Sequence, residues 1–229
     1  MIKKTESQHI RSFVRRQGRM TAAQEEALEI YWLEYGLEAE DVWQWESIFG
    51  RKGDVVLEIG FGNGETLIEQ AQRSPEQLFV GIEVHVPGVG HSLRLCKEHN
   101  LNNIRLCRDD AILVLEHQVP DASLSRVQIY FPDPWPKTKH HKRRLIQETW
   151  LNLLVQKIRP GGLIHMATDW APYAKEALQL FSSHAQLDNG AKQGGYVDRP
   201  DWRPVTKFEK RGTRLGHSSY DLLFEKIIK

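Results

Sequence analysis

The feature of this sequence that most limits its possible folds is a glycine turn between a short apolar run and a helix-forming stretch. Residues 55–59 read Val-Val-Leu-Glu-Ile and lead directly into Gly60-Phe-Gly-Asn-Gly64. Glycines at this spacing let the backbone turn sharply and approach a ligand closely. In doubly wound α/β sheets the first strand–helix turn is where nucleotides bind. We therefore expect Gly60, Gly62 and Gly64 to contribute to a cofactor site.

The rest of the chain alternates short apolar runs with helical stretches, which predicts a mostly parallel sheet with helices on both faces. Thr21 and Gln24 form a capping-box pattern that predicts a helix start at Thr21, and hence a helical N-terminal extension. Two terminal strands without a helix between them predict an antiparallel C-terminal hairpin, which makes seven strands in a Rossmann-like α/β fold. The expected strands are 55–59, 78–83, 104–107, 127–131, 163–168, 203–209 and 219–227. The expected helices are 65–73, 89–99, one from 110, 143–158 and 171–181, and residues 186–200 are expected to be a loop.

Charge around the glycine turn distinguishes two kinds of cofactor. A dinucleotide would bring an anionic pyrophosphate to this turn, where Glu58 and Glu65 would repel it. S-adenosylmethionine brings a sulfonium and an ammonium group instead, which carboxylates attract. Glu83 ends the second strand, where an acid can accept hydrogen bonds from both ribose hydroxyls, and Asp110 follows the third strand near the expected adenine end. The sequence therefore predicts S-adenosylmethionine as the cofactor.

A proline-rich loop, Phe131-Pro-Asp-Pro-Trp-Pro136, follows the fourth expected strand and should lie beside the same crevice. Its three prolines should stiffen the loop and preorganise Asp133 and Trp135. The next eight residues, 137–144, contain five Lys and Arg side chains. A rigid acid, an aromatic ring and dense positive charge together indicate a base-reading site with a phosphate clamp, although such a loop can also be a plain connector.

Positive charge is clustered in this chain, although its net charge is only +1. Besides 137–144, residues 1–19 hold six Lys and Arg against one acid, and residues 203–214 hold five against one. Clustered cations release counterions from a polyphosphate, so a folded RNA is the expected partner. No apolar run approaches the roughly 20 residues of a membrane span. Two separated cysteines make a metal site unexpected and favour a reducing cytoplasm.

Several runs of the sequence resemble one family, the bacterial tRNA (guanine-N7)-methyltransferases of the TrmB type. These runs are SFVRRQGRMT (12–21), LEIGFGNGE (57–65), GIEVH (81–85), FPDPWPKTKHHKRR (131–144), MATDW (166–170) and RPVTKFEKRGTRLGH (203–217). The resemblance implies a class I methyltransferase fold that methylates guanine 46 in the tRNA variable loop. We expect the chain to consist of a basic arm and helix (1–50) and a methyltransferase domain (51–229), and to act as a monomer or weak homodimer.

The resemblance also assigns roles to individual residues. It implies that Glu58, Glu83, Asp110 and Asp133 line the cofactor pocket and that Asp133 is the catalytic acid. It implies that substrate is faced by Lys137, Asp169, Thr206, Lys207, Phe208 and Glu209. From position alone, Asp169 could equally be a helix N-cap and residues 206–209 an edge strand. The neighbouring Asp109 leaves a one-residue ambiguity, which we resolve toward Asp110.

Guanine N7 has a lone pair and no proton, so its methylation needs placement rather than a base. We expect Asp133 to orient the guanine by its N1–H and N2–H edge and to stabilise the charge that develops on the ring. Two alternatives stay open at this point. One is methylation of an exocyclic amine, because Asp133-Pro134-Trp135 is similar to the Asp-Pro-Pro-aromatic loop of amino methylases. The other is a non-catalytic RNA-binding protein of the same fold.

Overall fold

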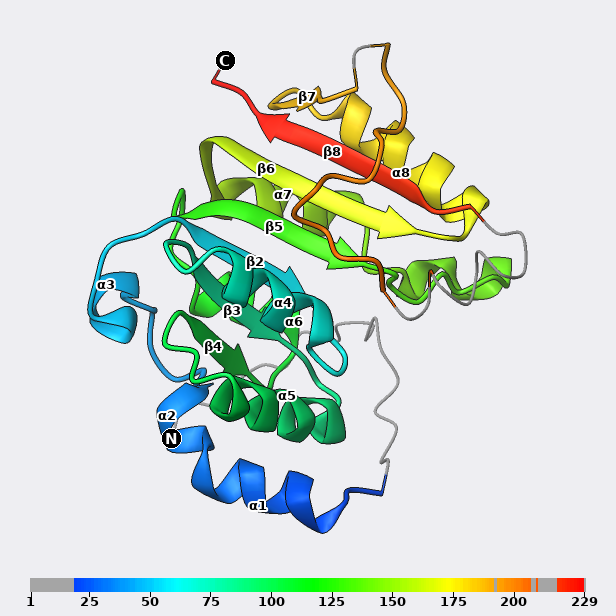
Figure 1. Cartoon of the computed structure of the whole chain (residues 1–229). Helices are drawn as coiled ribbons and strands as arrows, with labels where there is room; N and C mark the ends of the chain where they lie inside the picture. Colours follow the sequence, from blue (N-terminus) through cyan, green and yellow to red (C-terminus); the bar gives the residue numbers. More distant parts are fainter. Residues whose placement is uncertain (1–18, 192, 207–208, 210–217, 229) are drawn as a thin grey trace, which may run out of the picture.

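A computed structural model of the chain describes residues 19–191, 193–206, 209 and 218–228. Its centre is an eight-stranded sheet in the order β1-β4-β3-β2-β5-β6-β8-β7 (Figure 1). The strands are β1 (Gly36–Leu37), β2 (Val55–Ile59), β3 (Leu78–Ile82), β4 (Ile104–Cys107), β5 (Leu124–Tyr130), β6 (Ile158–Thr168), β7 (Leu187–Asn189) and β8 (Tyr220–Lys226). All pairs from β1 to β6 are parallel, whereas β8 runs antiparallel to both β6 and β7.

Helices cover both faces of this sheet (Figure 1). They are α1 (Ala22–Ile30), α2 (Trp32–Tyr35), α3 (Trp45–Phe49), α4 (Glu65–Arg73), α5 (Val86–Glu98), α6 (Ala111–His117), α7 (Glu148–Lys157) and α8 (Ala171–Ser183), with a 3₁₀ helix, η1 (Thr138–Arg143). Strand β2 illustrates why helices pack on both faces of the sheet, because its side chains belong to two different core clusters. Its Leu57 packs in a core cluster with α6, α7 and α8, whereas Val56 faces the cluster formed with α1, α4 and α5. Every residue of β2 is therefore buried, as expected for a central parallel strand.

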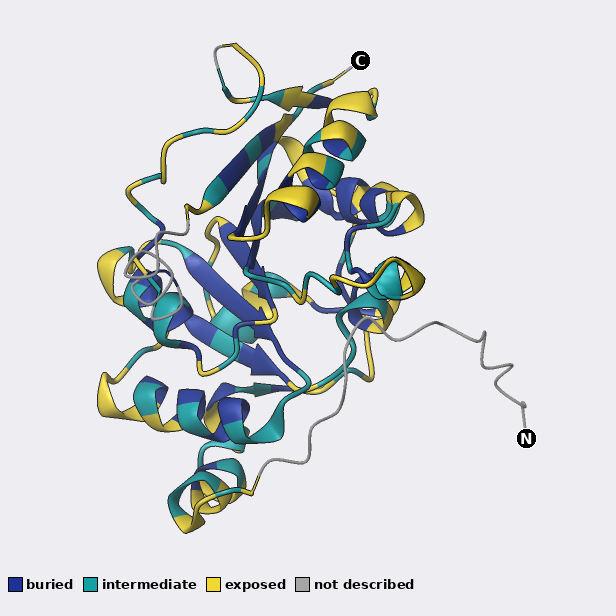
Figure 2. Ribbon diagram, turned by 90° about the vertical axis from the view of Figure 1, so that its right-hand side faces the viewer, coloured by how far each residue is buried: buried dark blue, intermediate teal, exposed yellow. Residues whose placement is uncertain are grey.

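The burial of residues matches this arrangement of a sheet between two layers of helices. The central strands are buried along their length, whereas the helices are exposed on the side that faces away from the sheet (Figure 2). Among the residues that the structure describes, no helix is long and apolar enough to cross a membrane.

The predicted fold class is confirmed, and so is the helix start at Thr21, whose backbone N–H donates to the Gln24 side chain at 2.9 Å. The strand count is different, because the two-residue β1 adds an eighth strand beside β4. The predicted strand at 203–209 is wrong: residues 203–206 form no strand, and β8 pairs instead with β7, within the stretch predicted to be a loop. Helix α7 begins at Glu148 rather than at 143, because η1 occupies the preceding basic residues.

Candidate active site

A cavity of about 240 Å³ opens at the carboxyl ends of β2, β3, β4 and β5. Four carboxylates line it, and none of its described lining residues is Lys, Arg or His. The four are Glu83, Asp109, Asp110 and Asp133. Backbone and apolar groups complete the wall, with Gly60 on one side and Ile129, Tyr130 and Phe131 on the other. The cavity is therefore suited to a ligand that combines apolar surface with positive charge.

Glu83 connects the end of β3 to the glycine turn. One of its carboxylate oxygens, Oε2, accepts a hydrogen bond from the Gly62 N–H at 2.8 Å. The other, Oε1, accepts from the N–H groups of Val84 and His85 at 2.7 and 2.8 Å. A carboxylate has about four lone-pair sites, so one acceptor position remains for a ligand hydroxyl. Glu83 therefore both fixes the turn and faces the cavity.

The glycine turn itself requires glycine for two reasons. Gly60 lines the cavity with φ +76°, in the left-handed region where a side chain is disfavoured. Gly64 caps α4 with φ +77°, and a Cβ on it would lie 2.2 Å from the Ser92 hydroxyl on α5. Gly62 does not line the cavity, but its N–H is the one held by Glu83. The three predicted glycines thus lie on one turn, with only Gly60 at the cavity wall.

Two neighbouring aspartates lie at the end of β4. Asp110 caps α6, because its side chain accepts a hydrogen bond from the Ile112 N–H at 2.9 Å. The side chain of Asp109 accepts from the Asp110 N–H at 2.7 Å. Both line the cavity, so the sequence analysis missed Asp109 by choosing between the two.

Glu58 lies under the cavity rather than on its wall. It is buried in β2, and its Oε2 accepts a hydrogen bond from the Gln128 side chain at 2.8 Å. Burial raises the pKa of Glu58 to about 7, and the Gln128 hydrogen bond offsets part of that effect. Glu58 is therefore only partly ionised near neutral pH.

The loop after β5 has an unusual backbone. Phe131 and Trp135 have φ of +52° and +43°, which is uncommon for residues other than glycine and marks local strain. Between them, the exposed Asp133 reaches the cavity wall. The Trp135 ring already has neighbours: the Arg143 guanidinium lies 5.0 Å above it and the His140 ring meets it edge-on at 5.8 Å. The strained residues thus bracket the acid that the sequence singled out.

The basic block of 137–144 divides into two groups. The side chains of Lys137, Lys139 and Lys142 are exposed. Arg144 is buried: it stacks on Tyr173, pairs with Glu176, and donates to the Pro134 carbonyl at 2.8 Å. The prediction that Arg144 belongs to a solvent-facing phosphate clamp is therefore wrong, since this cation holds the proline loop in place. Only the other cations of the block face solvent or Trp135.

Of the remaining predicted site residues, the described ones do not line the cavity. Asp169 is exposed directly after β6, but the N-cap of α8 is Trp170, so the helix-cap alternative for Asp169 is wrong. Thr206 and Glu209 bond each other: the Thr206 N–H donates to Glu209 at 2.9 Å, and the Glu209 N–H donates to the Thr206 hydroxyl at 3.1 Å. Lys207 and Phe208 lie outside the described residues.

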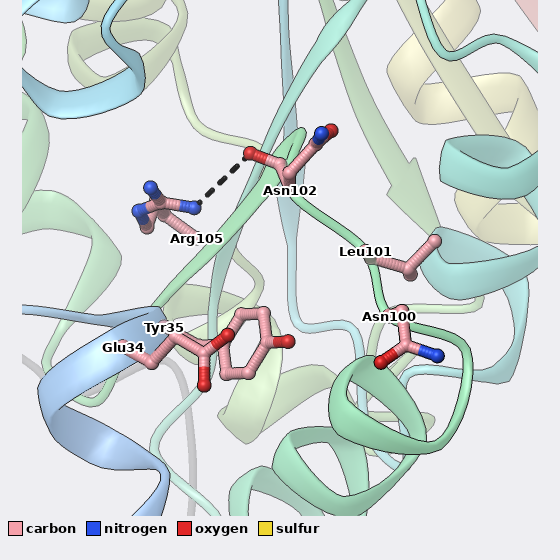
Figure 3. A pocket seen from close by; sticks show the side chains of 6 residues that line it. All are labelled: Glu34, Tyr35, Asn100, Leu101, Asn102 and Arg105. Atoms are coloured by element: carbon pink, nitrogen blue, oxygen red, sulfur yellow. Dashed lines mark hydrogen bonds between the residues drawn. The ribbon is translucent and has the colours of Figure 1, made fainter.

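A second, smaller cavity of about 180 Å³ lies beside the end of α2, where the chain enters β4 (Figure 3). Glu34 and Tyr35 of α2 line one side, and Asn100, Leu101 and Asn102 line the other. Arg105 closes it and donates to the Asn102 carbonyl at 3.4 Å. None of the predicted site residues that the structure describes lines this cavity.

Solved structures share this fold at low sequence identity. The aminoglycoside resistance methyltransferase NpmB1 has a TM-score of 0.55 at 15% identity, over 83% of this chain and 98% of that one. The 16S rRNA methyltransferase KamB has a TM-score of 0.54 at 15% identity, over 93% of this chain and 97% of that one. These likenesses concern the arrangement of helices and strands alone.

Sequence comparisons reach further. Residues 52–222 match the family described as "Putative methyltransferase". Two relatives named tRNA (guanine-N(7)-)-methyltransferase are 52% identical in Shigella boydii and 49% identical in Aeromonas hydrophila, each over 95% of this chain and 92% of the relative. A third with that name, from Alcanivorax borkumensis, is 50% identical over 95% of this chain and 91% of its own length. At this identity and coverage, the chain belongs to the same methyltransferase family as these relatives.

Proposed function

We propose that this chain transfers a methyl group from S-adenosylmethionine to N7 of a guanine in tRNA. The observation that carries the proposal is the cavity at the strand ends, with four carboxylates and no cation among its described lining residues. Such a wall attracts a sulfonium and repels a pyrophosphate. The tRNA substrate is supported by the names of the three relatives at 49–52% identity. We assign the target to position 46 of the variable loop on the resemblance described above.

In this proposal different residues of the cavity wall contact different parts of the cofactor. Glu83 accepts a ribose hydroxyl with the acceptor position left by its three backbone hydrogen bonds. Asp110, with Asp109 beside it, faces the adenine end, and Gly60 lets the backbone approach the ligand. Glu58 contributes to the site indirectly, through the hydrogen bond that it accepts from the Gln128 side chain. When bound, S-adenosylmethionine supplies an electrophilic methyl group on sulfur.

Asp133 orients the guanine in this scheme. Its carboxylate accepts hydrogen bonds from N1–H and N2–H, the edge of guanine remote from N7, so that N7 faces the cavity. No residue is required to remove a proton, since N7 has none. A carboxylate at this edge also stabilises the positive charge that develops on the purine during transfer. The strained residues on either side of Asp133 support a fixed orientation for it.

The remainder of the tRNA lies against the exposed cations and polar residues around the cavity. Lys137, Lys139 and Lys142 contact phosphates, and their exposure supports this role. We include Asp169 and the stretch 206–209 (Thr206, Lys207, Phe208 and Glu209) in the substrate surface on the resemblance. The proposal further describes a metal-free cytoplasmic enzyme that acts as a monomer or weak homodimer. The buried thiols of Cys96 and Cys107 are unpaired, which suits a reducing compartment.

The test is nucleoside mass spectrometry of unmodified tRNA treated with the enzyme and methyl-labelled S-adenosylmethionine. The expected product is N7-methylguanosine, with aniline-induced strand cleavage at position 46 after reduction. Label in an exocyclic amine would replace the proposal with the amino-methylase alternative. Absence of label in any tRNA would leave a non-catalytic RNA-binding protein.

A matched pair of variants tests the role of Asp133. Asp133→Asn should lower kcat by at least about tenfold while tRNA and cofactor binding hold, because the amide cannot accept at both guanine donors. Asp188→Asn, which changes an exposed acid on β7, should leave kcat unchanged. Turnover of the Asp133 variant at the level of the Asp188 variant would contradict the orienting role.

A further inference from the structure

Among the residues that the structure describes, the largest fully buried side chain is an arginine. Arg203 has no exposed surface, although it lies in a stretch with no regular secondary structure. Its Nε and Nη2 donate to the two oxygens of Asp221, both at 2.7 Å. Its Nη1 and Nη2 donate to the two oxygens of Glu209 at 2.6 and 2.7 Å. One guanidinium is thus held in two bidentate pairs, the strongest and most directional arrangement that arginine makes.

These contacts join β8, which contains Asp221, to Glu209 and to the end of β5. The guanidinium lies 5.7 Å from the ring centres of both Tyr130 and Phe131. Tyr130 ends β5, and Phe131 begins the strained loop and lines the cavity. Arg203 therefore lies against the ring of Phe131, two residues before Asp133 in the chain.

Both carboxylates also bond groups other than Arg203. Glu209 also accepts from the Thr206 N–H at 2.9 Å and from the Ser219 hydroxyl at 3.1 Å. Asp221 also bonds Nε2 of His165 at 2.7 Å. Burial alone would raise the pKa of both carboxyls, but their hydrogen bonds with Arg203 and their other partners hold each pKa below its ordinary value. Both acids are therefore charged at neutral pH, and the cluster is fully ionised.

The protonation of His165 follows from its partners. The indole N–H of Trp202 can only donate, and it lies 3.2 Å from Nδ1 of His165. The Tyr130 hydroxyl, which can donate or accept, lies 3.0 Å from the same nitrogen. With Trp202 donating, Nδ1 accepts, and the proton of a neutral ring is on Nε2, where it is donated to Asp221. Burial lowers the pKa of His165, which agrees with a neutral ring. The cluster thus has two negative charges and one positive charge, and the guanidinium is what holds the two carboxylates together.

An ion cluster of this kind is a poor means of gaining stability, since apolar residues of similar volume often stabilise a core as well or better. What it provides is a fixed relative orientation of the segments it joins. We propose that Arg203 is a positioning residue: by holding the rings of Tyr130 and Phe131 and the carboxylates of Glu209 and Asp221 on one guanidinium, it sets the direction of the backbone that presents Asp133. This inference rests on the proposed function only for its effect on methyl transfer.

The test compares two conservative substitutions. Arg203→Lys keeps the charge but loses both bidentate pairs and the planar contact with the rings. Arg159→Lys is the control, because Arg159 is a half-exposed residue with one hydrogen bond, to Asp54. Amide hydrogen exchange is measured without tRNA at the N–H groups within 131–135 (Phe131, Asp133 and Trp135) and within 203–206 (Arg203, Val205 and Thr206), since the prolines between them have none. The melting temperature and the affinity for S-adenosylmethionine are measured alongside. Then kcat and KM are measured with tRNA.

We expect Arg203→Lys to stay folded and to exchange faster in both segments, while its cofactor affinity equals that of Arg159→Lys. Its kcat should fall on the order of 10²-fold with a smaller change in KM, as for a misplaced reacting group. In Arg203→Ala, millimolar guanidinium should restore part of the lost kcat, which general destabilisation would not allow. If Arg203→Ala does not fold, the lysine variant alone decides.

Exchange at 131–135 equal to that of the control, or a loss of kcat that follows the unfolded fraction and is not rescued, would overturn the positioning role. If the native chain methylates no tRNA, the proposed function fails, whereas the exchange comparison still tests the role of Arg203.

Discussion

Glu83 offers the sharpest test of the site, because its three hydrogen bonds are all to backbone N–H groups. Glu83→Gln keeps the size of the side chain but replaces one acceptor oxygen with an NH₂ donor. If the remaining oxygen stays with Val84 and His85, the new NH₂ faces the Gly62 N–H at the 2.8 Å position where a bond now forms. If the amide is turned, two N–H groups are left without an acceptor.

The free-energy cost of Glu83→Gln follows from the hydrogen bonds that it removes or weakens. Losing one hydrogen bond to a charged acceptor costs about 1.5–3 kcal/mol. The two that remain are weakened, since neutral pairs are roughly half as strong as charge-assisted ones. We therefore expect the free energy of unfolding to fall by about 2–4 kcal/mol, and Tm by roughly 5–15 °C for a chain of this size. Affinity for S-adenosylmethionine should fall at least about tenfold, because the glycine turn loses its anchor.

Urea unfolding, thermal melting and calorimetry with S-adenosylmethionine measure these effects. Glu69→Gln is the matched control: Glu69 forms an exposed ion pair with Arg73, and such pairs are worth about 0–1 kcal/mol. If Glu83→Gln unfolds and binds cofactor like the control, the carboxylate does not hold the turn, and the reasoning from its hydrogen bonds is refuted.

Three further predictions concern charge. Burial raises the pKa of Glu58 to about 7, so the contribution of Glu58 to stability should be greatest below about pH 4.5, and on the order of 3 kcal/mol of unfolding free energy should be lost as the pH rises to 7. Glu58→Gln should flatten this pH dependence, measured by urea unfolding at several pH values. The same pH dependence in the variant and the native chain would contradict the prediction. Replacing Lys139 and Lys142 with Ala should reduce the salt slope of tRNA binding by about one per lysine at unchanged Tm, and an unchanged slope would make this face a solvated surface only. Arg144→Ala should instead lower Tm by several degrees, because it removes the contacts of the guanidinium with Glu176 and with the Pro134 carbonyl. An unchanged Tm would contradict the role of Arg144 in holding the proline loop.

The central part of the fold could be predicted because its signals are local. The strand at 55–59 and the helix at 65–73 have their predicted bounds, since apolar runs, a glycine turn and a proline after Ser74 are all readable within a few residues. Strands β1 and β7 could not be predicted in this way. They have two and three residues, too few for a hydrophobic pattern, and they exist because an adjacent strand offers an unpaired edge.

The errors at Arg144 and in the 203–209 stretch have a common cause. Both positions belong to basic, polar segments, so composition predicts exposure for Arg144 and alternating exposure for an edge strand at 203–209. In the structure each buried arginine pairs with an acid that lies well along the chain: Arg144 with Glu176 and Arg203 with Asp221, although Arg203 also pairs with the nearby Glu209. A buried cation is specified by such distant partners, which no local pattern reveals.

Within the candidate site, the sequence identified acids that follow successive strands, and the structure brings Glu83, Asp110 and Asp133 to one cavity. It could not show that Asp109 shares the wall, since either side chain of the pair could face inward. Nor could it show that Glu58 turns away from the cavity toward Gln128, because that depends on a neighbouring strand.

The central claim is that this acidic cavity accepts a cationic sulfonium cofactor. Isothermal titration calorimetry of the full chain with S-adenosylmethionine, and separately with a nicotinamide dinucleotide, tests it most directly. We expect saturable one-to-one binding of the sulfonium compound and no heat of binding from the dinucleotide. Saturable dinucleotide binding, with no response to S-adenosylmethionine, would contradict the account.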